Sequence, residues 1–378
     1  MMKTIINNEI KSIFSSPWKA TLFFIVPLVI TVYFGVIFQD GIIGHARTVL
    51  VDQDGSSLSR SLLREFRSNR GFDIVWELDD VSLAEQLVHR EAADVIVAVP
   101  PGFAADLKQG KSPALLLIAD AGNMAISSNA LKKANEIILT FSTGAEIQRL
   151  EGKGFLPAQA ENIALPLRFQ YRQVGNPSGS FYDFLLWGLI GAVGHFPMML
   201  FAVTSLSKEE ESQGSKTVLG KIAAYTLLGT TELLSCILLG TALFPLSFYG
   251  SIMALVLLTF VFALAIAAMG LFLSVIMPNH VLASQAGVVV VLPALLLSGH
   301  TWPLSGFPWF IKILGLAEPL TYYINPLRDL ALSQNPGLSY GQGLIVLAVM
   351  AFGYGGAAAL ISGRRKKVAQ WKQEILPS

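Results

Sequence analysis

Charged residues are scarce in this chain. Only 14% of its 378 residues are Asp, Glu, Lys or Arg, whereas 53% are hydrophobic, and the mean hydropathy is +0.56. Soluble domains usually carry about 25% charged residues. The composition therefore excludes an ordinary soluble protein and predicts extensive apolar surface that faces lipid.

A surplus of basic charge is also missing. The chain has 27 Lys and Arg residues against 26 Asp and Glu residues, and its net charge is +1. Nucleic-acid binding needs clustered positive charge that neutralises phosphates, so nucleic acid is not an expected partner. The basic cluster from Arg364 to Lys367 follows an apolar run, and we interpret it as a membrane stop signal.

Cysteine and catalytic motifs are equally sparse. Cys236 is the sole cysteine, so no disulfide can staple a folded domain. The five His residues are scattered without metal-ligand spacing, and no Gly-x-Ser-x-Gly motif occurs. Gly220 and Lys221 are followed by Ile222 and lack the upstream glycine of a Walker A loop. We therefore expect no catalytic residue, no metal site and no cofactor on this chain, and we expect that it is not itself an enzyme.

Long apolar runs are what the sequence does contain. A helix needs about 20 apolar residues to cross the hydrocarbon core of a bilayer. Six runs are near this length: Trp18 to Phe38, Phe181 to Leu206, Ile222 to Phe244, Ile252 to Met277, Val281 to Leu297, and Gly343 to Ile361 within residues 341–361. The sequence thus predicts a polytopic α-helical membrane protein with six transmembrane helices, the third to fifth lying within residues 222–297.

Flanking charge predicts the orientation of these helices. Basic residues before the first run, around residues 208–221 and in the tail at 362–378 all fall on one side of a six-pass arrangement. Loops rich in Lys and Arg stay in the cytosol. Both termini are therefore expected to be cytosolic.

Residues 39–180 differ from the rest because β-rich runs alternate with amphipathic stretches. Strands are expected at Thr48 to Val51, Phe72 to Trp76, Asp94 to Val99, Ala114 to Ala119 and Leu167 to Val174, and helices at Ser57 to Ser68, Ser82 to Glu91, Gly102 to Lys108 and Asn123 to Glu151. The last helix places Leu131, Ala134, Ile138, Phe141 and Ala145 on one stripe. Packing on the sheet is the favoured use of this stripe, and contact with a second subunit is the alternative. We predict an inserted α/β extracytoplasmic domain.

Residues 298–340, between the fifth and sixth runs, are rich in proline and aromatic residues. Such a segment cannot span as one helix, and it predicts a re-entrant or interfacial hairpin on the outer side. The residues that we single out in this outer hairpin are Pro303, Pro308, Trp309, Pro319, Tyr322 and Arg328.

Two cytosolic segments offer surfaces to a partner. Residues 1–17 predict an amphipathic helix on the inner membrane face, although Lys3 and Glu9 interrupt its apolar side. Residues 207–221 contain Lys208, Glu209, Glu210, Glu211 and Gly214. A charge run of this kind is either solvated surface or a docking site.

Two ionisable residues fall within apolar runs. Glu232 lies midway along the third run, where a charged carboxylate costs about 2.5–3.5 kcal/mol. His195 follows Gly188 and Gly191 at near-helical spacing in the second run. Each has two interpretations: a place in a translocation pathway, or a packing role, with Glu232 hydrogen-bonded or protonated and His195 beside a close helix contact.

The order of these features resembles the permease subunits of ABC-2 type export systems, in the branch with a large external domain after the first helix. The resemblance covers nearly the whole chain. It rests on the amphipathic start from Glu9 to Pro17, VLVDQDGSSLSRSL from Val49, ADVIVAVPPGFAADLKQG from Ala93, Asp120 followed by Asn123, and the outer hairpin.

The resemblance implies a permease in the bacterial inner membrane that dimerises with itself or a close relative. Separate ATP-binding subunits would bind ATP and magnesium, and the permease would export a hydrophobic or amphipathic substrate along helices one, two and five. A periplasmic adaptor is a further candidate partner. The ATPase would contact Glu9, Lys11, Lys208, Glu209, Glu210, Glu211 and Gly214. The cytosolic segment is shorter here than in the family, and a non-transporting membrane-anchored binding or scaffold protein remains the alternative.

Overall fold

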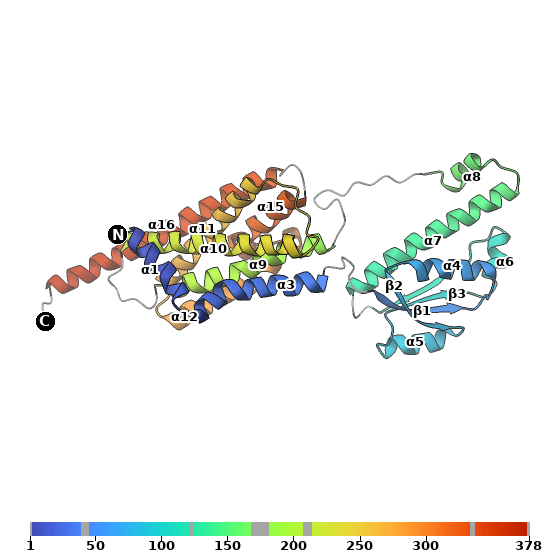
Figure 1. Ribbon diagram of the computed structural model, residues 1–378, viewed down its shortest axis with the longest axis horizontal. Coiled ribbons are helices and arrows are strands. Elements are labelled where there is room, and N and C mark those ends of the chain that lie inside the picture. The colour runs from blue at the N-terminus through green and yellow to red at the C-terminus, as the bar shows by residue number, and fades with distance from the viewer. Residues whose placement is uncertain are drawn as a thin grey trace. The chain divides into compact units, whose positions relative to one another are not determined.

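The protein is described from a computed structural model, which covers residues 2–38, 45–120, 122, 124–167, 181–206, 214–332 and 337–375. Two compact units make up the chain (Figure 1). One is the α/β unit, Ile42–Tyr171, and the other is the helical unit, formed by Met1–Gly41 and Arg172–Ser378.

The α/β unit is built on one four-stranded sheet in the order β2-β1-β3-β4. β1 pairs in parallel with β2 and β3, and β4 is antiparallel to β3. The strands are β1 (Ala46–Asp52), β2 (Phe72–Leu78), β3 (Val95–Val99) and β4 (Leu116–Ala119), and the helices are α4 (Ser57–Ser68), α5 (Val81–His89), α6 (Phe103–Lys108), α7 (Met124–Gly152) and α8 (Pro157–Ala164). Leu167 is not in a strand, and the rest of the fifth expected strand lies outside the described residues.

Burial explains this sheet. All five residues of β3 are buried, and so are Val49, Leu50 and Val51 of β1, as expected for central parallel strands covered on both faces. Leu50 packs with residues of α4, α6 and α7, whereas Val49 and Val51 pack with Ala84 of α5. Figure 1 shows α4 and α7 on one side of the sheet and α5 on the other.

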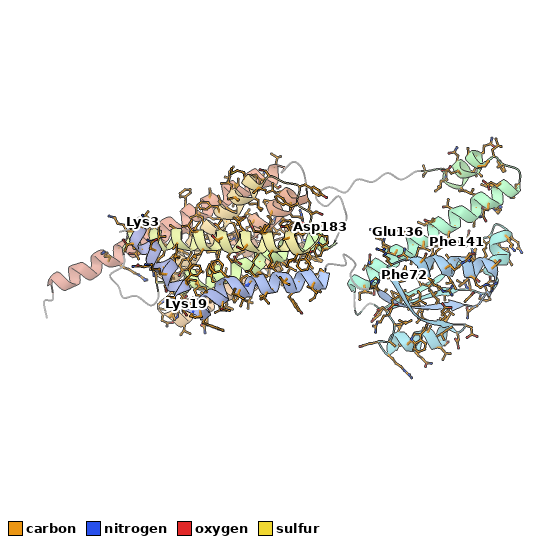
Figure 2. The ribbon with its side chains drawn as sticks, viewed as in Figure 1. Lys3, Lys19, Phe72, Glu136, Phe141 and Asp183 are labelled. Atoms are coloured by element: carbon orange, nitrogen blue, oxygen red, sulfur yellow. The ribbon has the colours of Figure 1, made fainter. Side chains whose placement is uncertain are left out.

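Helix α7 covers the sheet with a stripe close to the expected one. Ala134 is buried, and Ile138 and Phe141 pack against the same core, where Figure 2 marks Phe141 and Phe72. Leu131 differs, because it is 41% exposed and Ala130 takes the inward position. The stripe thus packs mainly within its own unit, as the favoured interpretation predicted.

The helical unit contains five helical stretches long and apolar enough to cross a membrane among the described residues: Pro17–Phe38, Tyr182–Thr204, Ser215–Leu243, Ile252–Ile276 and Leu338–Lys366. Its elements are α1 (Met2–Phe14), α2 (Pro17–Ala20), the π-helix η1 (Thr21–Ile25), α3 (Val26–Phe38), α9 (Phe181–Thr204), α10 (Ser215–Leu243), α11 (Ile252–Ile276), α12 (His280–Val291), α13 (Ala294–Leu297), the 3-10 helix η3 (Leu304–Gly306), α14 (Trp309–Ala317), α15 (Thr321–Leu332) and α16 (Leu338–Ile375). The chain is therefore a multi-pass membrane protein.

The fifth expected helix is interrupted in the structure. The apolar run from Val281 to Leu297 forms α12 and the short α13, with Pro293 between them. Proline has no N–H to donate, and its ring clashes with the preceding turn, so it breaks a continuous helix. Neither piece alone is long enough to span, so the fifth expected helix is not among the spanning stretches of the described residues.

Helix α11 lies at the centre of this unit and packs against α9, α10, α15 and α16. Small residues permit these close approaches. A Cβ added to Gly270 would lie 2.5 Å from the Cβ of Ala202 on α9. Small residues at such contacts are typical of membrane helices, because packing rather than hydrophobic exclusion holds them together.

One ion pair links the start of β1 to the start of β3 in the α/β unit. Asp94 accepts hydrogen bonds from the Arg47 backbone N–H at 2.8 Å, from Nε at 3.1 Å and from Nη2 at 2.7 Å. The side chain of Asp94 is 13% exposed and that of Arg47 is 44% exposed. Hydrogen bonds from Arg47 lower the pKa of the Asp94 carboxyl.

We predict that a fragment of residues 42–171 folds alone and that Asp94→Asn destabilises it by about 1 kcal/mol at pH 7, a value reduced for the exposure of Arg47. Because the folded-state pKa of Asp94 is lowered, this stabilisation exists above the unfolded pKa of about 3.9 and is lost as the pH falls through the folded pKa. Thermal melts of wild type and variant from pH 7 to pH 2 measure the difference. A difference that persists at pH 2, or a fragment without a cooperative melt, would contradict this account.

Candidate functional site

The helical unit contains a partly open apolar groove of about 450 Å³. Its walls are η1 with α3, α9, and α12 with α13, which are the first, second and fifth of the expected spans. Every lining residue is apolar: Leu22, Val26, Pro27, Ile30, Phe34, Ala192, Val193, Phe196, Pro197, Leu200, Phe201, Val291, Leu292 and Leu295. The groove can therefore hold an apolar group through burial, without hydrogen bonds from side chains.

Each wall of the groove carries a helix irregularity. Pro27 lies in α3 directly after the π-helix η1, Pro197 lies inside α9, and Pro293 separates α12 from α13. Proline removes a backbone hydrogen bond, and π-helical turns are frequent at functional sites. Each of the three walls thus has an irregular or missing backbone hydrogen bond close to the groove.

A buried pair of ionisable groups holds the opposite face of α9. The Nε2 atom of His195 lies 3.4 Å from Oε1 of Glu318, and their side chains are 0% and 5% exposed. Glu318 sits in the turn between α14 and α15. Sequence reasoning missed Glu318. The signal that could have identified it was a carboxylate within an otherwise apolar and aromatic stretch.

This contact fixes the depth of the hairpin. His195 lies about 21 Å along α9 from its first residue, at a rise of about 1.5 Å per residue. Tyr354 lies about 24 Å along α16 from its start by the same measure, and its hydroxyl donates to the Ala317 carbonyl at 3.3 Å. The α14–α15 turn therefore packs against the middle of both α9 and α16, and the choice between a re-entrant and an interfacial hairpin stays a prediction.

Glycines let α9 approach its neighbours closely on the side that carries His195. A Cβ added to Gly188 would lie 2.3 Å from the His300 ring, and one added to Gly191 would lie 3.2 Å from the Tyr323 ring. One added to Gly194 would lie 2.3 Å from Leu233 of α10. The spacing of Gly188, Gly191 and His195 therefore marks a close packing face, as one of the two interpretations proposed.

Glu232 is fully buried at the contact between α10 and α9. Its Oε1 atom lies 3.5 Å from the Cys236 thiol, one turn later on α10, and its Oε2 atom faces Gly194. Neither Glu232 nor His195 belongs to the lining of the groove. The structure thus places the two expected translocation residues in the packed core on another side of α9.

The expected coupling residues have different surroundings. Lys11 is exposed, but Glu9 is turned toward α10, with Oε2 3.5 Å from Lys221 Nζ and Oε1 accepting a hydrogen bond from the Tyr225 hydroxyl. Gly214 is the N-cap of α10. Lys208, Glu209, Glu210 and Glu211 lie outside the described residues.

The environment of α1 differs from the expected one. Ile13 is 2% exposed, and Ile5 lies against Gly220 of α10. Helix α10 begins at Ser215, before its apolar run starts at Ile222, and so offers a surface to α1. Protein therefore covers much of the apolar side of α1, which was expected to lie on the membrane.

The expected hairpin residues occupy both exposed and packed positions. Pro303 precedes η3, Pro308 precedes α14, and Trp309 is 75% exposed. Pro319 lies in the turn, and the Tyr322 hydroxyl donates to the Leu316 carbonyl at 3.1 Å. The guanidinium of Arg328 lies 5.9 Å from the centre of the Phe184 ring and 3.0 Å from the Asp329 carboxylate. Arg328 thus links α15 to α9.

Comparison with known proteins shows which family this chain matches. Residues 18–360 match the model of the family described as ABC-2 family transporter protein. The probable multidrug ABC transporter permease YbhR of Escherichia coli is 22% identical over 341 residues, covering 87% of this chain and 89% of that protein. The related permease YbhS of Escherichia coli is 22% identical over 75% of this chain and 79% of its own length. The linearmycin resistance permease protein LnrN of Bacillus subtilis is 28% identical over 108 residues, 29% of this chain and 28% of that protein.

We predict that the His195–Glu318 contact stabilises the helical unit. The two side chains are in contact without a hydrogen bond between them, and leaving one buried polar group without its polar neighbour costs about 1–3 kcal/mol. His195→Leu and Glu318→Leu should each lower the melting temperature of the purified protein in detergent. The double variant should lose less than the sum, with a coupling of about 1–3 kcal/mol. Thr231→Leu, at an exposed position of α10, serves as the control. Strictly additive losses would show that the two side chains do not interact.

Proposed function

Since this chain belongs to the ABC-2 transporter family and is a multi-pass permease of that family, we propose that it exports a hydrophobic or amphipathic substrate from the cytosol. A separate ATPase would supply the energy. The observation that carries this proposal is the apolar groove between α3, α9 and α12–α13. Transport pathways must admit their substrate, and a groove without polar side chains admits apolar groups.

The groove supports a particular substrate class. Its volume of about 450 Å³ lies within the range of pockets that bind drug-sized molecules. Moving apolar surface from water into the groove stabilises such a ligand by about 25 cal/mol per Å², whereas an unpaired polar group moved there from water costs about 1–3 kcal/mol. Polar groups of the substrate are therefore expected outside the groove. Two relatives are named probable multidrug permeases, which agrees with selection by shape and apolarity.

The proposed topology has six spans, with α12 and α13 together forming a broken fifth span. Lys3 and Lys19 lie at one end of the helical unit and Asp183 lies at the other, as Figure 2 shows. Positive residues mark the cytosolic end. This distribution supports cytosolic termini in a bacterial inner membrane and an α/β unit outside the cytosol.

A separate ATPase is proposed to dock on the cytosolic end and to bind ATP and magnesium. The exposed side of α1 offers Lys3, Asn7, Asn8 and Lys11, and we propose this side as one docking surface, opposite an acidic surface of the ATPase. The other proposed docking surface is the cytosolic segment of residues 207–217. A second permease subunit would complete the transporter.

We predict that Ala192→Trp, which places an indole in the groove, lowers ATP-dependent export about tenfold, as a loss of about 1.4 kcal/mol in binding would. The assay is ethidium uptake by inside-out vesicles containing the chain and its ATPase. Val289→Trp adds the same group at a position that is 70% exposed and outside the groove lining, and should export normally. Normal export by Ala192→Trp would remove the groove from the pathway. Absence of any co-purifying ATPase would favour the scaffold alternative.

A further inference from the structure

Lys221 is a buried lysine near the start of α10, and its position is unusual for a basic residue at a membrane edge. Its side chain is 5% exposed, whereas Lys3 and Lys11 of α1, the helix that packs on α10, are exposed. Taking an ammonium group out of water costs several kcal/mol unless it is paired. Lys221 is therefore not a solvated anchor, and its contacts must compensate for its burial.

The first contact of Lys221 is with α1. Its Nζ atom lies 3.5 Å from Glu9 Oε2, and the hydroxyl of Tyr225, one turn later, donates to Glu9 Oε1. Next to Lys221, Gly220 leaves room for Ile5, whose Cγ2 atom would be 2.8 Å from an added Cβ. Gly220 and Lys221 thus form a contact surface for α1 on α10. Glu9 interrupts the apolar side of α1 because it contacts Lys221 and Tyr225 on this surface of α10.

The second contact of Lys221 is with the end of α9. Nζ donates to the Ser205 carbonyl at 2.7 Å, directly after the last residue of α9. Carbonyls at a helix C-terminus have no partner within the helix, and a cation is favourable there. The next residue, Leu206, is held to α11 by a hydrogen bond from its N–H to Ser274 Oγ at 3.0 Å. One ammonium group therefore joins α1 to α9.

The two helices that meet at Lys221 lead to two walls of the groove. Helix α1 continues through α2 and η1 into α3, which forms one wall. Helix α9 forms the facing wall, and its lining residue Phe201 lies about one turn before Ser205. A displacement of α1 reaches α3 through the chain itself. At the end of α9 Lys221 adds a polar link, beside the packing of α3 on α9 and the contact of the Phe23 ring with the Phe201 ring, whose centres are 5.5 Å apart.

We propose that Lys221 is a positioning residue of the transport cycle, which transmits displacement of α1 to α9 and so moves two walls of the groove together. This inference rests on the proposed function, in which an ATPase acts on α1. Lys221 touches neither the groove nor the proposed docking side of α1. Its role is to make α9, a wall of the groove, move together with α1, the helix that faces the ATPase.

The test uses the full chain with its ATPase in vesicles. Cys236→Ala removes the sole cysteine, and Ala192→Cys then places one thiol in the groove. The readout is the change in maleimide labelling rate caused by ATP with vanadate, measured beside ATP hydrolysis and melting temperature. Lys221→Met should keep hydrolysis but reduce the nucleotide-dependent change about fivefold or more, at the low end of coupling between sites. Lys221→Arg should restore part of it, and Lys312→Met, at an exposed lysine on α14, should match the parent.

A charge swap separates the contact of Lys221 with Glu9 from its hydrogen bond to Ser205. Glu9→Lys with Lys221→Glu can restore the ion pair between α1 and α10, but a carboxylate cannot donate to the Ser205 carbonyl, so the response should stay low. Where Lys221→Met does not assemble, Glu9→Gln with Tyr225→Phe weakens only the α1 side and should also reduce the response. A response equal to the parent in Lys221→Met, in the swap or in the Glu9 and Tyr225 variant would overturn the inference. A parent that neither binds an ATPase nor responds to nucleotide would instead refute the proposed function.

Discussion

Close contacts with the hairpin, with α10 and with Lys221 fix the position of α9 inside the apolar bundle, and the other features of the helical unit follow from that position. His195 meets Glu318 of the hairpin, and Ser205 meets Lys221. Gly194 admits Leu233 and Glu232 of α10. Close packing at the glycines and the hydrogen bond from Lys221 to Ser205 therefore specify which face of α9 turns inward. The remaining face forms the groove.

This arrangement separates two tasks on one helix. The face of α9 that lines the groove is apolar, from Ala192 to Phe201, and can hold a ligand only through shape and burial. The other faces carry the polar contacts and the glycines, which tie α9 to the hairpin, to α10 and to α1. Pro197 lies in the same helix, where its missing hydrogen bond weakens the ladder. A helix held at His195 and Ser205 and weakened near Pro197 can respond to forces from either end.

The sequence predicted features that depend on local pattern. Strands β1 to β3, helices α4 to α7 and five spanning stretches lie close to their expected ranges, because hydrophobic periodicity and N-caps such as Ser56 act locally. Features that depend on distant partners were missed. Glu318 has meaning only beside His195, far away in sequence, and Glu9 interrupts its apolar stripe because Lys221 and Tyr225 face it. The groove itself could not be derived from local pattern, because its lining comes from three walls that only the packing of the helices brings together.

Nucleotide bound at a separate ATPase is expected to reshape the groove of this permease. Spin labels at Ile30→Cys on α3 and Val193→Cys on α9, in a Cys236→Ala background, place one label on each facing wall. The distance between them is measured by double electron–electron resonance in vesicles with the ATPase, without nucleotide and with ATP and vanadate. The account predicts that the distance distribution shifts when nucleotide is trapped. An unchanged distribution, in a complex that hydrolyses ATP and exports substrate, would contradict it.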